Sequence, residues 1–228
     1  MFPRNSGVLA LTSDASVDFT PEDFNAPLTP AQRAYLKTKT GLDLPRVFWR
    51  QQVHGDRVLV AEGKPEGCRS YPPADAFVTH QKGLALAIRT ADCVPVFIFD
   101  PVQKVIGLAH AGWKGARQQI AAKTVKTMQD KFGCRCYDLT VMFGPAIRSC
   151  CYQVGVEFKE HFPEHVSARA GKLYFDMCGA LRRQMRQAGV PDQNISDREV
   201  CTCCGQNCFS FRRDGAKAGR MISLMVLI

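Results

Sequence analysis

The sequence predicts an α/β or α+β protein built as one domain. Short apolar runs rich in β-branched residues, typical of buried strands, alternate with longer segments whose apolar residues recur at helical spacing. Hairpin-like turns join several of the strands, so the sheet is not expected to be purely parallel. No internal repeat, low-complexity tract or long linker divides the 228 residues, and we therefore expect a single domain from residue 1 to residue 228.

In the first half of the chain, residues that turn or cap the backbone mark the ends of each element. Residues 1–28 are expected to be mostly loop, with one strand at 8–12. A helix begins after Thr29, because Pro30 suits the first helical turn, and it ends at Gly41. Further strands are expected at 47–50, 57–61, 74–79 and 84–89, the last two as a hairpin, with a loop rich in Gly and Pro at 62–73.

In the second half, the strands at 94–99 and 105–109 are separated by Asp100-Pro101, which breaks the apolar run and predicts a hairpin. A helix at 116–131 places its apolar residues on one face and stops at Gly133. The remaining expected elements are strands at 139–143, 174–175, 199–202, 209–212 and 221–228, and helices around 155–161 and at 177–188.

The composition indicates a globular protein and limits the partners that it is expected to bind. A hydrophobic share of 46% and a charged share of 22% are those of an ordinary globular protein. The net charge of +9 fits either a basic solvated surface or an anionic substrate such as phosphate. Nucleic acid is not expected as a partner, because no dense Lys/Arg run is present. No stretch approaches the roughly 20 apolar residues of a membrane helix.

Eleven cysteines do not indicate a disulfide framework, because several are adjacent in the sequence and no secretory leader is evident. Free thiols in a reducing cytoplasm are the simplest interpretation. The cysteines between Cys201 and Cys208 resemble half of a zinc ribbon. Four cysteines in so short a segment would strain tetrahedral coordination of one ion, so no second metal is expected there.

The functional prediction depends on the two strands of the 94–109 hairpin. Cys93 directly precedes the first strand, and His110 directly follows the second. In a hairpin the start of one strand lies beside the end of the other, so the thiol and the imidazole meet. A sulfur and a nitrogen ligand together suit zinc, whereas the same pair without metal would suit nucleophilic catalysis. With neither role, Cys93 would be a buried thiol and His110 a core histidine.

His54 is the third candidate ligand, because it also follows a strand and precedes a glycine. Catalytic zinc sites commonly use three protein ligands and leave a fourth position open. His54, Cys93 and His110 would make such a set. Asp92, the neighbour of Cys93, is expected to act as a general base or to orient a ligand, unless it only caps a turn.

An anion site is expected where a helix follows the second strand of the hairpin. Free amides at the helix start, with Lys114 and Arg117 nearby, would bind phosphate. The glycine spacing from Gly112 to Gly115 fits neither a Walker nor a dinucleotide motif, and a tight turn alone would also need small residues. Arg212 or Arg213, in a segment that leads into an Asp-Gly turn, is expected to reach into the site as a further anion clamp.

Taken together, the motifs resemble the laccase-domain, or polyphenol-oxidase-like, family. The matching segments, which cover residues 46–228 in order, are Gln52-Val-His-Gly, Ala74-Asp-Ala, Thr90-Ala-Asp-Cys-Val-Pro, His110-Ala-Gly-Trp-Lys-Gly, Gly144-Pro-Ala-Ile, Cys151-Tyr-Gln-Val-Gly and Phe209-Ser-Phe-Arg-Arg-Asp-Gly-Ala-Lys-Ala-Gly-Arg. The family usually begins with Arg-Gly-Gly-Val-Ser and Ser-Leu-Asn-Leu segments. This chain offers only Arg4-Asn-Ser-Gly-Val, so residues 1–45 are divergent.

The resemblance implies a layered α/β/β/α domain and a zinc-dependent purine nucleoside phosphorylase, with His54, Cys93 and His110 as the zinc ligands. Its substrates would be adenosine, inosine and methylthioadenosine together with phosphate, with adenosine deamination as a side activity. Some relatives are described as peptidoglycan precursor editing factors. Copper fits less well, because the extra histidines of a trinuclear cluster are missing. A metal-free Cys–His hydrolase or amidase and a non-enzymatic zinc-binding regulator remain the alternatives.

Overall fold

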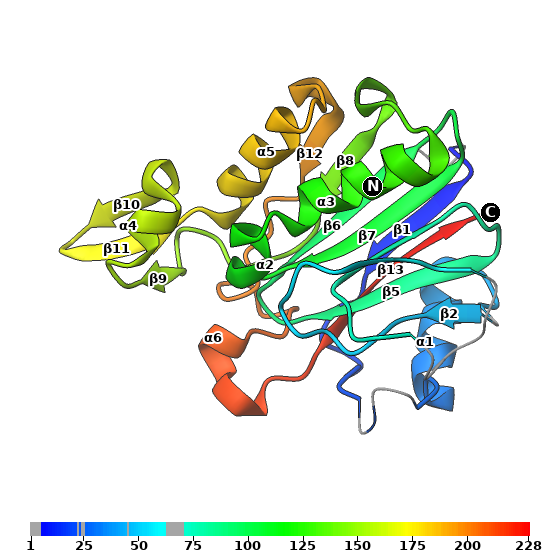
Figure 1. Ribbon diagram of the computed structural model, residues 1–228. Coiled ribbons are helices and arrows are strands. Elements are labelled where there is room, and N and C mark those ends of the chain that lie inside the picture. Colours follow the sequence, from blue (N-terminus) through cyan, green and yellow to red (C-terminus); the bar gives the residue numbers. More distant parts are fainter. Residues whose placement is uncertain (1–5, 22, 24–25, 45, 63–70) are drawn as a thin grey trace.

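Two stacked β-sheets form the centre of the computed structural model, which describes residues 6–21, 23, 26–44, 46–62 and 71–228 (Figure 1). In the described part of the chain, one sheet has six strands in the order β12-β8-β6-β7-β4-β3, and the other has four in the order β1-β13-β5-β2. The first sheet comprises β3 (Val58–Val60), β4 (Ala76–Thr79), β6 (Val94–Asp100), β7 (Val105–Ala111), β8 (Thr140–Phe143) and β12 (Ile195–Asp197). The second comprises β1 (Val8–Thr12), β2 (Arg46–Phe48), β5 (Leu84–Thr90) and β13 (Met221–Leu227).

Helices cover the outer face of each sheet. The helices α3 (Ile120–Phe132) and α5 (Met177–Gln187) lie on the six-stranded sheet, and α1 (Pro30–Thr40) lies on the four-stranded sheet (Figure 1). One apolar cluster joins α3 and α5 to their sheet, a second fills the space between the sheets, and a third joins α1 to its sheet. This α/β/β/α order confirms the predicted fold class, with both antiparallel and parallel pairs in each sheet.

A smaller unit projects from one end of the domain (Figure 1). Its three-stranded sheet has the order β10-β11-β9 among the described residues, and helix α4 accompanies it. The bounds are β9 (Gln153–Val154), α4 (Phe158–His161), β10 (Val166–Arg169) and β11 (Lys172–Phe175). Short 3₁₀ turns occur at Cys136–Asp138, Pro163–His165, Asp192–Asn194 and Gly215–Lys217. No helix within the described ranges is long and apolar enough to cross a bilayer.

The predicted central hairpin is confirmed. β6 and β7 pair antiparallel from Val94↔Ala111 to Asp100↔Val105, and every residue of both strands is buried. Their continuous apolar runs reflect this burial, since one face of the hairpin meets α3 and the other meets the second sheet. The register places Pro95 opposite His110, so the residue before β6 lies beside the end of β7.

The first predicted helix is also confirmed, and its ends follow from local chemistry. The Thr29 hydroxyl accepts the backbone amide of Gln32, while the Gln32 side chain accepts the amide of Thr29, which is a capping box. Gly41 ends the helix in the left-handed conformation, with φ of 73°. The helix predicted at 116–131 is instead split into α2 (Trp113–Arg117) and α3, because Gln119 takes a left-handed φ of 62° between them.

Three predictions about strands are wrong: the hairpin of 74–79 with 84–89, the strand at 209–212 and the strand at 199–202. The segments 74–79 and 84–89 form no hairpin: β4 pairs with β3 and β7, whereas β5 pairs with β13 and β2 in the other sheet. Each strand is buried on both faces, and stacking two sheets satisfies that burial better than pairing the two as neighbours. The segment 209–212 is not a strand, because Ser210 caps a short helix, α6 (Phe211–Asp214).

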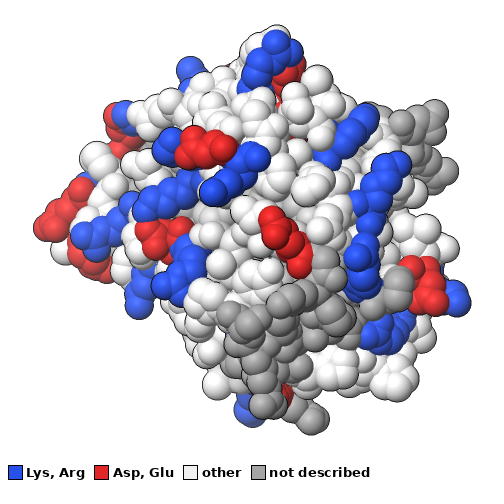
Figure 2. Space-filling view, turned by 45° about the vertical axis from the view of Figure 1, so that its right-hand side comes forward, with Lys and Arg blue, Asp and Glu red and all other residues white. Residues whose placement is uncertain are grey.

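The remaining predictions differ mostly at their boundaries. In place of a strand at 199–202, only an isolated bridge between Ala146 and Cys201 is present in the described chain. The predicted loop at 62–73 lies mostly outside the described residues. Figure 2 shows Lys and Arg side chains on both sides of one face, mixed with acidic side chains.

Shortening a core side chain in β6 tests this packing. Ile98 is fully buried in the cluster between the six-stranded sheet and α3. Ile98→Ala leaves a cavity there, so we expect the free energy of unfolding to fall by about 2–5 kcal/mol in denaturant titrations. Val102→Ala, in the turn after β6 where the side chain is 56% exposed, is the control and should change it by less than about 0.5 kcal/mol. Equal losses in both variants would contradict the assigned core.

Candidate metal centre

A buried aspartate organises the site. Asp75 precedes β4, and its side chain is completely shielded from solvent. One carboxylate oxygen accepts hydrogen bonds from the His54 amide at 3.0 Å and from His110 Nδ1 at 2.8 Å. The other accepts the amides of Val53 and Gly55 at 3.1 and 2.9 Å. Asp75 therefore holds the loop that carries His54 against the strand that carries His110.

The loop at His54 is shaped by this anchoring. His54 takes a left-handed φ of 57°, which a histidine adopts more readily than a β-branched residue does. Three consecutive amides, from Val53 to Gly55, point at the Asp75 carboxylate. This turn brings the exposed His54 ring to within 4.8 Å of the His110 ring, centroid to centroid, at an angle of 76°.

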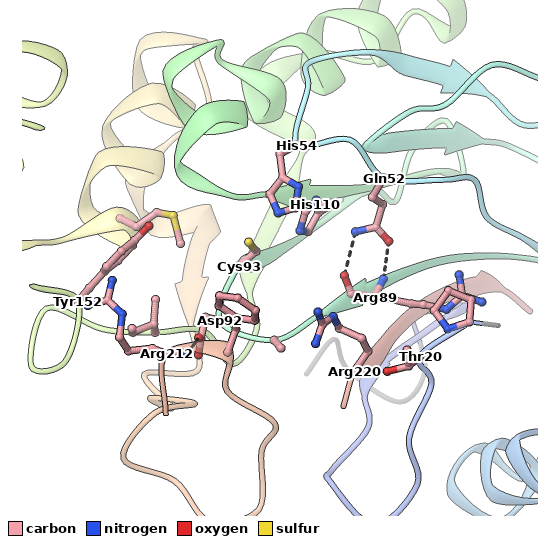
Figure 3. A pocket seen from close by; sticks show the side chains of 15 residues that line it. Thr20, Gln52, His54, Arg89, Asp92, Cys93, His110, Tyr152, Arg212 and Arg220 are labelled. Atoms are coloured by element: carbon pink, nitrogen blue, oxygen red, sulfur yellow. Dashed lines mark hydrogen bonds between the residues drawn. The ribbon is translucent and has the colours of Figure 1, made fainter. Parts of the chain in front are cut away.

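Cys93 completes a cluster of three possible ligands. The Cys93 sulfur and one ring nitrogen each of His54 and His110 all lie within 4.8 Å of one another. Figure 3 shows the three side chains pointing toward one another. Gly112 permits the close approach, because a Cβ there would lie 2.9 Å from His54 Cδ2 and 3.0 Å from Cys93 Sγ.

The electrostatics of this cluster favour an ionised thiol. Burial opposes ionisation of Cys93, but the imidazoles of His110 and His54 outweigh it and lower the pKa of Cys93 to about 6. Burial also opposes the charge on His110, but Cys93 and Asp75 outweigh it and raise the pKa of His110 to about 9. Burial would raise the pKa of Asp75, yet its hydrogen bonds to His110 and to backbone amides lower it.

This arrangement fits a divalent metal ion. With Nδ1 of His110 bound to Asp75, Nε2 is the ring nitrogen left for a metal, as in carboxylate–histidine–metal triads. The proton that His110 holds beside the Cys93 thiolate is one that a cation would displace. One sulfur and two nitrogens make a three-ligand set with room for a further ligand from the adjoining cavity. Without a metal, the same thiolate beside His110 has the chemistry of a cysteine nucleophile.

The three side chains line a cavity of about 550 Å³, within the range of small-molecule sites (Figure 3). Its wall comes from segments far apart in the sequence. The lining residues are Thr20, Pro21, Gln52, His54, Arg89, Ala91, Asp92, Cys93, His110, Ile147, Tyr152, Met177, Phe211, Arg212 and Arg220. Thr20 and Pro21 show that the N-terminal segment contributes to this wall.

Three arginines bring positive charge to the cavity. Arg89 is held by its backbone, which exchanges two hydrogen bonds with the Gln52 side chain at 2.7 and 2.8 Å. Its Nε is buried and finds no hydrogen-bond partner in the described structure, and burial lowers the pKa of Arg89 to about 10. Arg212 and Arg220 also line the cavity, each held through hydrogen bonds to backbone carbonyls.

The other predicted site residues occupy different positions. Lys114 and Arg117 lie on α2 and are not among the residues that line the cavity, and Lys114 Nζ lies 5.7 Å from the centre of the Trp113 ring. Asp92 does line it, but both of its oxygens are engaged: one accepts the Thr202 hydroxyl and the other the Arg212 amide, each at 2.6 Å. Asp92 thus ties β6 to the C-terminal loops.

Sequence reasoning missed Asp75, Arg89 and Arg220 as site residues. The sequence did contain a signal for Asp75, since an acidic residue between two alanines opens a buried strand. Arg89 lies within an otherwise apolar strand, which marks a buried cation. Arg220 is the last residue of the Phe209 motif, and no local pattern connects it with the hairpin.

Comparison with known proteins agrees with this architecture. A family model described as multi-copper polyphenol oxidoreductase laccase matches residues 13–228. A protein named purine nucleoside phosphorylase from Aquifex aeolicus is 34% identical over 184 residues, covering 80% of this chain and 84% of its own length. The purine nucleoside phosphorylase YlmD of Bacillus subtilis is 32% identical over 209 residues, covering 85% of this chain and 75% of its own.

Solved structures of the same kind superpose over most of the chain. The crystal structure of YlmD from Geobacillus stearothermophilus has a TM-score of 0.85 and 29% identity, covering 97% of this chain and 92% of that one. A Bacillus licheniformis hypothetical protein, YfiH, also gives 0.85, with 28% identity and coverage of 97% and 93%. These matches confirm the resemblance found in the motifs. The chain therefore belongs to the multi-copper polyphenol oxidoreductase laccase family, whose members include proteins named purine nucleoside phosphorylase.

Proposed function

We propose that the protein is a zinc-dependent purine nucleoside phosphorylase, which cleaves adenosine, inosine or methylthioadenosine with phosphate to a free base and a sugar 1-phosphate. The observation that carries the proposal is the convergence of His54, Cys93 and His110 on a cavity that also contains three arginines. The names of the relatives support the reaction class. We also propose adenosine deamination as a side activity and a cytoplasmic location, where free thiols stay reduced.

His54, Cys93 and His110 would hold the zinc ion. One thiolate and two imidazoles suit zinc, and the described residues offer no additional histidine cluster for a multi-copper centre. Bound there, zinc would supply a Lewis acid for an oxygen atom of the substrate. Asp75 would act as a positioning residue, because its bond to Nδ1 fixes the tautomer and the orientation of His110.

The arginines would bind the phosphate nucleophile. Arg89, whose guanidinium lies over the Trp49 ring, offers a buried Nε without a hydrogen-bond partner in the described chain, and a phosphate oxygen would satisfy it. Arg212 and Arg220 would add charge and fix the direction of attack on C1′ of the sugar. The phosphate oxygen forms the new bond to C1′ as the bond to the purine nitrogen breaks, and that electron pair leaves with the base. Asp92 would position Arg212 through its amide.

Aromatic side chains would hold the purine. Tyr152 and Phe211 line the cavity, and the Arg212 guanidinium lies 5.3 Å from the centre of the Tyr152 ring. A flat base can stack on such rings. Burial raises the pKa of Tyr152 above its usual range, so its hydroxyl stays protonated and available as a donor.

A metal-free thiol hydrolase is the second candidate. The low pKa of Cys93, about 6, and the adjacent His110 favour it, since Cys93 would be the nucleophile and His110 the acid–base group. The two candidates differ in what a chelator does, because removing zinc would abolish phosphorolysis but would leave a thiol hydrolase active.

Incubation with inosine and phosphate tests the reaction directly. We expect ribose 1-phosphate to form, a strong chelator to abolish its formation, and added zinc to restore it. His110→Ala should lose the activity, whereas His80→Ala, at an exposed histidine that does not line the cavity, should retain it. Chromatography of the products measures the outcome, and a separate incubation with adenosine in place of inosine reports deamination through the release of inosine. Absence of ribose 1-phosphate from zinc-replete protein would refute the proposal.

Asp75→Asn tests the positioning of the ligands. The amide keeps the shape of the carboxylate but loses its charge, so His110 is oriented less firmly, and we expect zinc affinity to fall about 10–100-fold. Competition with a chromogenic chelator measures the affinity, and circular dichroism checks that the fold is intact. Asp130→Asn, on the exposed face of α3, is the matched control. Unchanged affinity in Asp75→Asn would rule out this role.

Arg89→Met tests the phosphate site. Methionine keeps much of the apolar stem but removes the charge, so we expect KM for phosphate to rise roughly 10–100-fold, as for loss of a charged hydrogen bond. KM for inosine should change much less. Lys126→Met, on the exposed surface of α3, controls for loss of net charge. Arg117→Met tests the alternative anion site expected at α2. A rise in KM for phosphate in Arg117→Met, without a rise in Arg89→Met, would favour that site over the cavity.

A further inference from the structure

A second group of four side chains able to bind a metal lies outside the cavity. It consists of Cys150, Cys151, Cys201 and Cys204, whose sulfur atoms all lie within 4.8 Å of one another. The Cys204 sulfur is 3.5 Å from that of Cys150 and 3.1 Å from that of Cys151. Four sulfurs bound tetrahedrally to one zinc ion at 2.3 Å lie about 3.8 Å apart. The cluster is therefore the size of a single-ion site, whereas a cluster of several irons would need the sulfurs to stand wider apart.

Contacts other than the sulfurs hold the two halves of this cluster together. Cys150 and Cys151 lie in the turn before β9, and Cys201 and Cys204 form a C-x-x-C segment between β12 and α6. Ala146 joins the segments, donating its amide to Val200 O at 3.1 Å and accepting the Thr202 amide at 3.0 Å. Arg148 adds a bidentate pair with Asp197 at 2.6 and 2.7 Å. The protein backbone thus brings the four thiols together before any ion binds.

The surroundings of the cluster suit thiolates. Positive side chains bind the two loops that carry the cysteines. Arg169 donates to the Cys150 carbonyl at 2.9 Å, and Arg213 donates to the Gly205 carbonyl at 2.8 Å. A zinc ion with four thiolates carries a net charge of −2, which the Arg169 guanidinium would offset in part, whereas Arg213 is already paired with Asp214.

We propose that Cys150, Cys151, Cys201 and Cys204 bind a structural zinc ion. Binding releases the thiol protons and transfers no electrons. With four protein ligands the ion has no position for substrate, so its role is structural rather than catalytic. The close spacing within 201–208 does not prevent coordination, because only two ligands come from that segment and two come from Cys150 and Cys151.

The zinc ion would clamp one wall of the cavity. Thr202, between two of the ligands, donates its hydroxyl to Asp92, and Asp92 accepts the amide of Arg212. The Arg212 guanidinium donates a hydrogen bond to the Gln153 carbonyl at 2.8 Å. Gln153 follows Cys150 and Cys151, so this bond joins Arg212 to the segment with the other two ligands. Cross-linking the two segments through one ion therefore fixes the loop that carries Arg212 and the segment that carries Tyr152.

Metal analysis of purified variants tests this proposal independently of the first site. We expect two zinc ions per wild-type chain, one in His110→Ala, one in Cys150→Ser and none in the double variant. Cys203→Ser is the matched control, since Cys203 is adjacent to Cys204 but is not one of the four ligands. Mass spectrometry under native conditions and elemental analysis give the counts. If only the proposed function fails, the wild-type chain still holds one zinc ion and Cys150→Ser removes it. If this proposal fails, Cys150→Ser leaves the zinc count unchanged.

The zinc retained by His110→Ala identifies its ligands without disturbing the four cysteines. X-ray absorption of that variant should show four sulfur neighbours at about 2.3 Å and no nitrogen shell. Cobalt-exchanged His110→Ala should show the thiolate charge-transfer band, and adding Cys150→Ser to that variant should remove it. Zinc counts unchanged by Cys150→Ser, His110→Ala free of zinc, or a disulfide among the four cysteines of freshly purified protein would each overturn the proposal.

Discussion

The buried carboxylate of Asp75 is the interaction on which the rest of the site depends. Its two oxygens accept four hydrogen bonds, three from the amides of residues 53–55 and one from His110 Nδ1. A carboxylate shielded from solvent is costly unless it is fully hydrogen-bonded, so the loop and the histidine are held in one arrangement. Both imidazoles of the cluster are thereby positioned by a single side chain that contacts neither solvent nor the cavity.

The layered fold explains why the site lies at one end of the central hairpin. The interior of β6 and β7 is filled by apolar residues that pack on both faces, which leaves only the strand ends for polar groups. Cys93 and His110 lie at that end, and Gly112 lets their neighbours approach closely. Arg89 lines the cavity from the second sheet, so stacking of the two sheets lets strands of both contribute to one cavity.

The C-terminal loops extend this organisation outward. Asp92 joins β6 to Thr202 and to Arg212, and the Arg212 guanidinium joins the same loops to the segment before β9. The four cysteines that link these segments stand apart from the three ligands of the cavity. In the proposed function, the four cysteines would order one wall, whereas His54, Cys93 and His110 would face the substrate. A mixed set of nitrogen and sulfur suits an open centre, whereas an all-sulfur set suits a closed one.

Local patterns in the sequence determined the elements whose ends are fixed by nearby residues. These are the helix capped by Thr29 and Gly41 and the hairpin that sets Cys93 beside His110. The partnership of β4 and β5 was misassigned, because a short turn between apolar runs does not specify whether the strands share a sheet. Asp75, Arg89 and the pairing of Cys150 and Cys151 with Cys201 and Cys204 were decided only by the tertiary structure. Their contacts join segments separated by tens of residues, and only burial between layers brings such segments together.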